Sequence, residues 1–200
     1  MSETPSTMLP LGTRLPGLRL TDAITGRVVD AAEEARGKKG LVVSFMCNHC
    51  PFVKHIRREL VRVAHAALDQ GFGVLAVNSN DGKAFPEDGP AAMRDLAQEE
   101  RWRFPFLFDE AQAVAKDFRA ACTPDFFLFD AEQRLVYRGQ FDDSRPSNEK
   151  PVTGASLSAA IEAVAAGRMP AADQKASVGC NIKWKPGNAP AYFASPVLTG

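Results

Sequence analysis

The chain has 200 residues, enough for one compact domain whose core needs no disulfide bonds. Its composition is that of an ordinary globular protein, and 24 basic residues balance 24 acidic ones, which argues against nucleic acid or an anionic membrane as a partner. No apolar run approaches the roughly 20 residues of a membrane helix, and the first residues lack the basic and apolar regions of a secretory signal. We therefore expect a cytoplasmic protein.

The sequence predicts one domain with a short addition at each end. Residues 1–14, rich in Ser, Thr and Pro, are predicted to form an N-terminal tail, residues 15–170 the domain, and residues 171–200 an irregular C-terminal extension packed on it. Apolar and polar residues alternate from Leu18 to Asp30 around Thr25-Gly26, which predicts a β-hairpin. The following segment EEARGKK, residues 33–39, is expected to be a solvent-exposed loop.

Strands and helices then alternate along the chain. The β-branched run from Leu41 to Met46 predicts a buried strand, and apolar residues at helical spacing predict a helix from Pro51 to Gln70 that ends at Gly71. The next predicted elements are a strand at 73–78, a turn at 80–82, a helix at 91–101, a strand at 104–108, a helix at 111–119, a hairpin of strands 125–130 and 134–139, and a helix at 156–166. This order predicts an α/β fold with parallel βαβ units and an antiparallel finish.

The most informative segment is SFMCNHCP, residues 44–51, where a CxxC motif joins the buried strand to the helix. Cysteines three residues apart on a first helical turn lie on one face, close enough for a disulfide. We expect Cys47 to meet the helix N-terminus, where free N–H groups and the helix dipole stabilise a thiolate, and Cys50 to lie one turn inward. His49 and the basic residues after it add positive charge, so we expect a lowered pKa for Cys47.

Two other interpretations of the motif stay open. A CxxC can be half of a zinc site, but zinc normally needs a second pair at similar spacing, and only Cys122, Cys180 and scattered histidines remain. The two cysteines could instead be buried and inert. We expect no metal and no other cofactor.

A second signal is Thr123-Pro124, directly before the apolar run DFFLFD. A proline that enters a central strand conflicts with ladder hydrogen bonding unless it marks a special turn, and a cis peptide is one such turn. A strand–CxxC–helix segment followed by Thr-Pro before an apolar strand that ends in Asp resembles the thioredoxin superfamily. The opening LPLGTRLPGLRLTDAITG is similar to the start of the redoxin and alkyl-hydroperoxide-reductase branch.

Three further segments, CNHCPFVK, ACTPDFFLFD and GCNIKWKPGN, are similar to a peroxiredoxin-like branch of bacterial thioredoxin-fold proteins. The resemblance covers roughly residues 9–190. It implies a thioredoxin fold, in which helices flank a central mixed β-sheet, here with an N-terminal β-hairpin and a C-terminal irregular extension.

The resemblance also implies roles for single residues. Cys47 would attack a substrate disulfide, and Cys50 would resolve the mixed disulfide that forms. Pro124 would be cis and pack against the disulfide, while Thr123 would offer backbone groups to an incoming peptide. Asn48, inside the motif, is a second candidate for substrate binding.

The remaining thiols and the histidine complete the expected site. In a thioredoxin fold Cys122 would lie close to the Cys47 pair, either as a small buried filler or as a third thiol that exchanges with Cys47. Cys180 would be a resolving or capping residue if the C-terminal extension folds over the site. His49 resembles the histidine of oxidising periplasmic enzymes, where it stabilises the reduced form and so raises the reduction potential.

The chain departs from these families at several positions. Met46 stands where thioredoxin has Trp, and Ser44 is the nearest polar residue to its buried Asp. Peroxiredoxins place Thr or Ser three residues before the peroxidatic cysteine and Pro four residues earlier. For Cys50 the first of these positions is Cys47, and for Cys47 the proline position is Gly40, so the peroxidase pattern is broken in either register.

The favoured function is thiol–disulfide exchange through a Cys47–Cys50 couple, with a protein or small-molecule disulfide as substrate and a thiol as electron donor. The alternative is a thiol peroxidase in which Cys47 reduces hydroperoxides through a sulfenic acid and Cys50 closes the disulfide. A third is a non-catalytic redox-sensing module whose tail is released when the pair oxidises. We expect a monomer or a weak homodimer.

Overall fold

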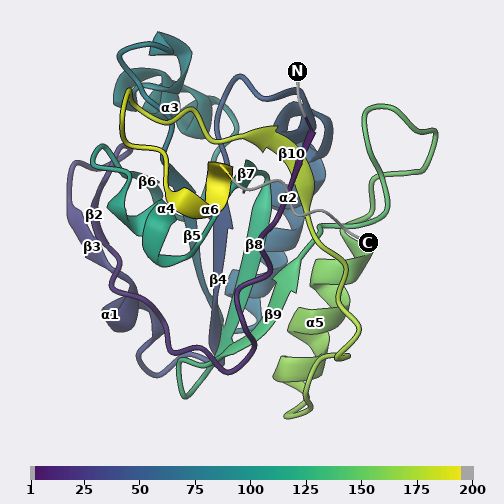
Figure 1. Ribbon diagram of the computed structural model, residues 1–200. Helices are drawn as coiled ribbons and strands as arrows, with labels where there is room; N and C mark the ends of the chain where they lie inside the picture. The colour runs from purple at the N-terminus through teal and green to yellow at the C-terminus, as the bar shows by residue number, and fades with distance from the viewer. Residues whose placement is uncertain (1–2, 195–200) are drawn as a thin grey trace.

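The computed structural model describes residues 3–194 as a seven-stranded mixed sheet with helices on both faces, together with a small three-stranded sheet (Figure 1). The large sheet has the strand order β3-β2-β6-β5-β4-β8-β9. Its strands are β2 (Arg19–Asp22), β3 (Val28–Asp30), β4 (Gly40–Phe45), β5 (Gly73–Asn78), β6 (Phe106–Phe108), β8 (Asp125–Asp130) and β9 (Leu135–Gly139). This architecture is the thioredoxin fold expected from the sequence.

The direction of the central strands positions the site. β4 runs parallel to β5, and β5 runs parallel to β6, whereas β8 is antiparallel to both β4 and β9. Because the carboxyl ends of parallel strands meet at one edge of a sheet, the segment after β4 lies beside the segment after β5. The N–H of Met46 accordingly donates to the carbonyl of Val77 at 2.9 Å.

Alternating side chains on the central strands fill one core on each face of the sheet. On β4 Val42 faces one core, while Val43 and Phe45 face the other. The first core lies under α2 (Pro51–Asp69), α3 (Pro90–Glu99) and α5 (Ala155–Ala165), and the second under α1 (Ala31–Ala35) and α4 (Ala113–Asp117). The sheet is therefore buried on both faces, as an α/β fold requires.

Helix α2 begins where its sequence favours a start. Pro51 is the first helical residue, a position at which its fixed φ and missing N–H cost nothing. The apolar side chains of Val53, Ile56, Leu60 and Val63 recur at helical spacing and are all buried in the first core. The predicted helix from 51 to 70 is confirmed, and it fixes the position of the residue just before it, Cys50.

Most predicted elements are confirmed, and the predicted strands at 73–78 and 125–130 match β5 and β8 end to end. The segment 33–39 differs, because its first residues belong to α1 rather than to a loop. The side chain of Asp30 accepts hydrogen bonds from the N–H groups of Ala32 and Glu33, and such a cap stabilises a short helix. The predicted strand at 104–108 is shorter and begins at Phe106.

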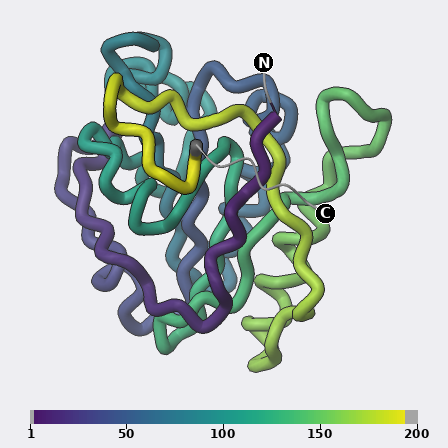
Figure 2. Tube along the Cα trace, viewed as in Figure 1, coloured from purple at the N-terminus to yellow at the C-terminus, as the bar shows by residue number. Residues whose placement is uncertain are grey.

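The C-terminal segment expected to be irregular contains a strand, β10 (Val178–Asn181). It lies between β1 (Glu3–Pro5) and β7 (Cys122–Thr123) in the small sheet, and both pairs are antiparallel. Figure 2 shows the first described residues running beside the segment that contains β10. A short helix, α6 (Ala191–Ala194), follows. Residues 1–2 of the predicted tail and 195–200 of the predicted extension lie outside the described residues.

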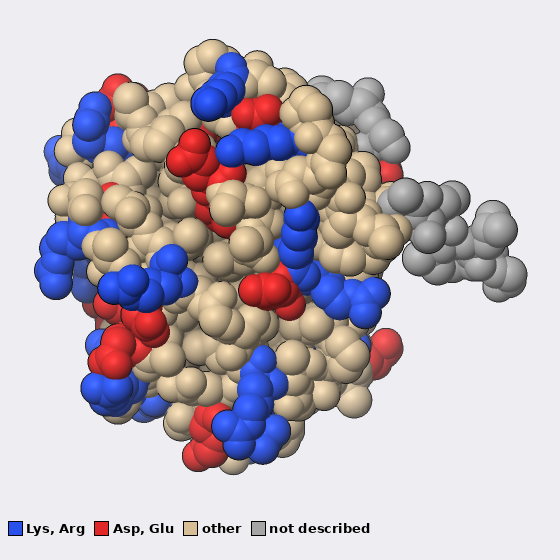
Figure 3. Space-filling view, turned by 60° about the vertical axis from the view of Figure 1, so that its left-hand side comes forward, with Lys and Arg blue, Asp and Glu red and all other residues tan. Residues whose placement is uncertain are grey.

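Two features of the whole molecule bear on partners. Among residues 3–194, no helix combines the length and the apolar character needed to span a membrane. On the face drawn in Figure 3, acidic and basic side chains are interspersed and form no extended field of one sign, in keeping with their equal numbers in the sequence.

Candidate active site

The two cysteines of the CxxC motif lie at the start of α2, but not as the sequence predicts. Cys50 is the residue that caps the helix, directly before Pro51, and Cys47 lies in the connection that precedes it. The expectation that Cys47 meets the helix N-terminus is therefore wrong, because Pro51 opens the helix and pushes Cys50 out of helical geometry. Both thiols are free, and both are almost completely buried.

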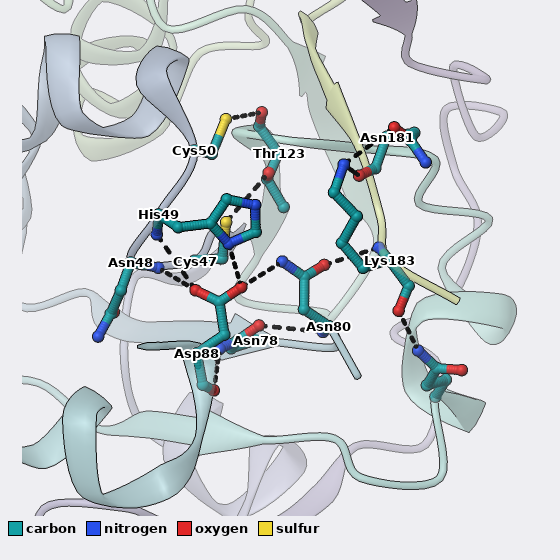
Figure 4. Close-up of polar contacts among 11 residues, drawn as sticks. Cys47, Asn48, His49, Cys50, Asn78, Asn80, Asp88, Thr123, Asn181 and Lys183 are labelled. Carbon is teal, nitrogen blue, oxygen red and sulfur yellow. Dashed lines mark hydrogen bonds and ion pairs between the residues drawn. The ribbon is translucent and has the colours of Figure 1, made fainter. Parts of the chain in front are cut away.

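Thr123 contacts both of these thiols (Figure 4). Its Oγ1 lies 3.5 Å from Cys47 Sγ, and its carbonyl oxygen accepts a hydrogen bond from Cys50 Sγ at 3.3 Å. The peptide bond between Thr123 and Pro124 is cis. The structure thus brings Cys47, Cys50 and Thr123-Pro124 into one cluster, although 73 residues separate Cys50 from Thr123.

The negative charge of the reduced pair is stabilised on Cys50. Its pKa is lowered to about 5, first because the Cys47 thiol donates to its sulfur and further because the Cys180 thiol and the Val53 N–H do so, and this outweighs burial. Cys50 also donates a hydrogen bond to the Thr123 carbonyl, which favours the protonated thiol. The groups that stabilise the thiolate have the larger combined effect on the Cys50 pKa. A sulfur at a helix N-terminus is the expected place for a thiolate.

Cys47 shows the opposite effect. Its pKa is raised well above the usual value, first because it donates to the Cys50 sulfur, then because it is buried and lies near the carboxylate of Asp88. The predicted lowering of the Cys47 pKa is therefore wrong. His49, expected to add positive charge beside Cys47, has its ring nitrogen Nδ1 bound to that same carboxylate.

Asp88 organises the connection that carries the cysteines. Its fully buried carboxylate accepts four hydrogen bonds: from the N–H groups of Asn48 and His49 at 2.8 and 3.2 Å, from His49 Nδ1 at 2.5 Å and from Asn80 Nδ2 at 2.7 Å. Figure 4 shows all of these donors converging on the carboxylate. The His49 ring stacks on Phe85 with centroids 5.3 Å apart. Asp88 thus holds the CxxC segment and fixes the ring of its histidine.

Asp88, which belongs to the 3₁₀ helix η1 (Pro86–Asp88), is not among the residues predicted for the site. One signal was available: the polar run Asn78-Ser79-Asn80 follows a strand parallel to the one that precedes the CxxC motif. Polar side chains there must lie near the motif, and Asn78 and Asn80 do bind the backbone carbonyl and the carboxylate of Asp88.

Three side chains at this place offer ligand atoms for a metal ion. Atoms of Cys47, His49 and Asp88 all lie within 4.8 Å of one another. The four hydrogen bonds to Asp88 occupy both of its carboxylate oxygens, so a metal here would have to displace the His49 ring from that carboxylate. The donor set fits a hydrogen-bonded cluster better than a metal centre.

The other two cysteines have different positions. Cys180 lies on β10, directly opposite Thr123, and is buried in the same core as Cys47 and Cys50. Cys122, next to Thr123, faces the other way and donates to the carbonyl of Pro124 at 3.8 Å. Burial raises the pKa of Cys122 well above the usual value. The structure therefore places Cys180, and not Cys122, as the third thiol in contact with the pair.

The backbone of Thr123 has a partner within the chain. β10 pairs with β7 so that Cys180 stands opposite Thr123 in the ladder. The expectation that Thr123 offers free backbone groups to an incoming peptide is thus wrong for this state of the molecule. Asn48, the second candidate for substrate binding, is half-buried, its N–H is bound to Asp88, and its Oδ1 has no partner among the described residues.

A second buried carboxylate, Asp125, follows Pro124 directly. It accepts a hydrogen bond from Ser6 Oγ at 2.9 Å and interacts with Ser177, so it links the segments that carry β1 and β10 to the core. Burial raises its pKa to about 7. Ser44, the polar residue expected nearest to the position of thioredoxin's buried acid, donates to the carbonyl of Leu75 at 3.4 Å.

The family of the chain is shown by its sequence. A sequence model of the Redoxin family matches residues 10–157, and the chain therefore belongs to this family. Membership supports a thioredoxin-like redox function and an oxidoreductase activity, with thiols or disulfides as the consistent substrates. No protein with a curated description matches the sequence.

Solved structures share the fold of this chain. The chain is similar to an uncharacterized conserved protein from Geobacillus kaustophilus, with 49% identity, a TM-score of 0.90, and 93% of this chain and 98% of that chain covered. A hypothetical protein from Sinorhizobium meliloti 1021 shares 47% identity at a TM-score of 0.89, with 92% and 100% covered. A secreted disulfide oxidoreductase from Mycobacterium tuberculosis, 18% identical over 73% and 95% of the two chains with a TM-score of 0.56, shares the fold.

Proposed function

We propose that this redoxin is a thiol–disulfide oxidoreductase whose redox couple is Cys47 and Cys50. The observation that carries the proposal is the cluster of two free, buried thiols that both contact Thr123, next to the cis bond to Pro124. The CxxC spacing allows the two sulfurs to form a disulfide when the pair gives up two electrons. The substrate is a disulfide of a protein or a small molecule, and a second thiol compound restores the reduced pair.

The position of the charge sets the order of the two steps. The Cys50 thiolate attacks one sulfur of the substrate disulfide, forms a mixed disulfide with it, and expels the other substrate sulfur as a thiolate. Cys47 then gives its proton to a departing sulfur and attacks Cys50, so that the Cys47–Cys50 disulfide forms and the second substrate thiol leaves. In this order Cys50 is the nucleophile and Cys47 the resolving cysteine, the reverse of what the family resemblance implies, because Cys50 and not Cys47 lies at the N-terminus of α2.

Single-turnover reactions of the reduced protein with oxidised glutathione test the couple and its order. We expect the Cys47→Ser/Cys180→Ser double variant, which lacks both neighbouring thiols, to accumulate a glutathione adduct on Cys50, and Cys50→Ser to react at least about 100-fold more slowly, since it lacks the low-pKa thiolate. Cys122→Ser, a change at a buried thiol outside the couple, is the matched control and should behave as the unaltered protein. An adduct trapped on Cys47 in the Cys50→Ser protein would reverse the proposed order, and full turnover by both of these variants would refute the couple.

The same low-pKa sulfur at Cys50 favours one other reaction, the reduction of a hydroperoxide. Oxygen transfer would convert the Cys50 thiolate to a sulfenic acid and release an alcohol or water, and Cys47 would then condense with it to form the disulfide and water. Stopped-flow mixing with hydrogen peroxide separates the two functions. We expect a rate like that of an ordinary thiolate, because the residue three positions before Cys50 is Cys47 rather than Thr or Ser.

A further inference from the structure

Strand β10 lies against the cysteine cluster more closely than an ordinary neighbouring strand. It pairs with β7 on one side and with β1 on the other, which places Gly179 and Cys180 beside the backbone of Thr123. A methyl group at position 179 would collide with the carbonyl oxygen of Thr123, the same oxygen that accepts from Cys50. The glycine therefore lets the strand approach the cluster closely.

Cys180 and the reactive Cys50 are buried in the same core, and each thiol shifts the pKa of the other. Only 2% of Cys180 is exposed, and Cys50 is completely buried. Cys180 stands opposite Thr123 in the ladder, and Cys50 donates to the carbonyl of the same threonine. Two buried sulfurs held against one residue in this way are placed to form a bond.

Several hydrogen bonds hold β10 in this position. After the strand, Lys183 donates its N–H to Asn80 Oδ1 at 2.8 Å, and its carbonyl accepts from Gln112 Nε2 at 2.9 Å. Asn80 also donates to Asp88, so the segment that follows β10 is joined to the network that holds the CxxC motif. Figure 4 shows this path from the His49 ring through Asn80 to Lys183.

We propose that β10 is an internal substrate of the redox pair, and that Cys180 exchanges with the Cys47–Cys50 disulfide to form a Cys50–Cys180 disulfide. This inference rests on the proposed function in so far as the Cys47–Cys50 disulfide is the oxidant. Cys180 loses its proton and attacks Cys50 Sγ, the Cys47–Cys50 bond breaks, and Cys47 leaves as a thiolate that takes up the proton. One disulfide replaces another, so no electrons are gained or lost.

The electrostatics favour this exchange in the oxidised protein. In the reduced protein the pKa of Cys180 is raised to about 12 by burial and, further, by the hydrogen bond to Cys50 and its charge. Oxidation of the Cys47–Cys50 pair removes that charge, whereas the nearby ammonium group of Lys183, which lowers the pKa of Cys180, remains. Cys180 is therefore more easily deprotonated when there is a disulfide for it to attack.

The exchange would act as a latch over the site. With Cys180 bonded to Cys50, β10 is covalently fixed along Thr123, and no peptide can add to that edge. Cys47 is then a free thiol beside His49 and Asp88. Attack of Cys47 on Cys50 Sγ reverses the exchange, restores the Cys47–Cys50 disulfide and releases β10.

Disulfide mapping of the full-length chain tests the proposal. Reduced protein is oxidised with diamide, quenched in acid, alkylated with N-ethylmaleimide and digested, and the disulfides are identified by mass spectrometry. We expect both Cys47–Cys50 and Cys50–Cys180 in the unaltered protein, a dominant Cys50–Cys180 disulfide in Cys47→Ser, and only Cys47–Cys50 in Cys180→Ser. Cys122→Ser is the matched control and should give the unaltered pattern.

The outcomes separate this inference from the proposed function. If Cys47→Ser gives no Cys50–Cys180 disulfide while the unaltered protein forms Cys47–Cys50, the latch is refuted and the redox couple stands. If Cys50–Cys180 forms in Cys47→Ser but the unaltered protein never forms Cys47–Cys50, the proposed couple fails and the contact between Cys50 and Cys180 is the redox pair. A Cys50–Cys122 disulfide as abundant as the Cys50–Cys180 disulfide would refute the claim that Cys180 alone is placed to bond with Cys50.

Discussion

The buried carboxylate of Asp88 offers the most direct test of how the site is held together. Asp88→Ala removes the acceptor of four hydrogen bonds and leaves their donors unpaired inside the protein. At a net value of about 1 kcal/mol for each bond, the loss is about 4 kcal/mol.

Asp88→Asn gives a graded second perturbation. Its remaining oxygen can still accept from the N–H groups of Asn48 and His49, but its amide would face the donors His49 Nδ1 and Asn80 Nδ2. We therefore expect a loss of roughly half that of the alanine variant, about 2 kcal/mol.

Urea unfolding of the reduced protein measures both losses in the free energy of unfolding, and thermal unfolding follows them as a fall in Tm. For a chain of this length about 4 kcal/mol corresponds to a fall in Tm of roughly 10 °C. Asp95→Ala, on the exposed face of α3, is the matched control: its ion pair with Arg94 is open to solvent, and we expect a change within about 0.5 kcal/mol. A loss of less than about 1 kcal/mol in Asp88→Ala would refute the view that this carboxylate holds the CxxC segment.

Three further changes test other parts of the site. Gly179→Ala should lift β10 and speed alkylation of Cys180 by at least about tenfold, whereas Gly17→Ala, with no atom within 4 Å of the added methyl, should not; equal rates would contradict the close approach. Asn80→Ala removes one hydrogen bond to the buried carboxylate and one from the backbone after β10, and we expect urea unfolding to show a loss of about 2 kcal/mol. Burial raises the pKa of Asp125 to about 7, so the stability that its neutral form contributes is complete below its ordinary value of about 4 and is lost as pH rises through 7. The free energy of unfolding should fall between pH 5 and 8 more steeply in the unaltered protein than in Asp125→Asn, and parallel curves would contradict this.

Local sequence patterns predict most of the fold. Runs of β-branched and apolar residues mark β4, β5 and β8, and the helical spacing after Pro51 marks α2. These elements are predictable because their side chains must face a core at the period of a strand or of a helix, whichever neighbours supply that core. The C-terminal strand β10 has no such pattern, since its four residues are set by pairing with β1 and β7.

The residues of the site divide in the same way. The CxxC motif and Thr123-Pro124 stand out in the sequence because cysteine spacing and a proline before a strand are local signals. Asp88 and Asp125 carry no local signal, because an acidic residue in a loop or at a strand end reads as exposed until the chain around it is folded.

The chemistry of the thiols depends on both the sequence and the tertiary structure. The sequence alone specifies which sulfurs are close in the chain and that a helix begins at Pro51. Only the tertiary structure decides which sulfur carries the charge, since this depends on groups brought from distant segments: Cys180 lowers the pKa of Cys50, and the carboxylate of Asp88 raises that of Cys47. A pKa is set by the charges and donors within a few ångströms in space, and long-range packing determines which those are.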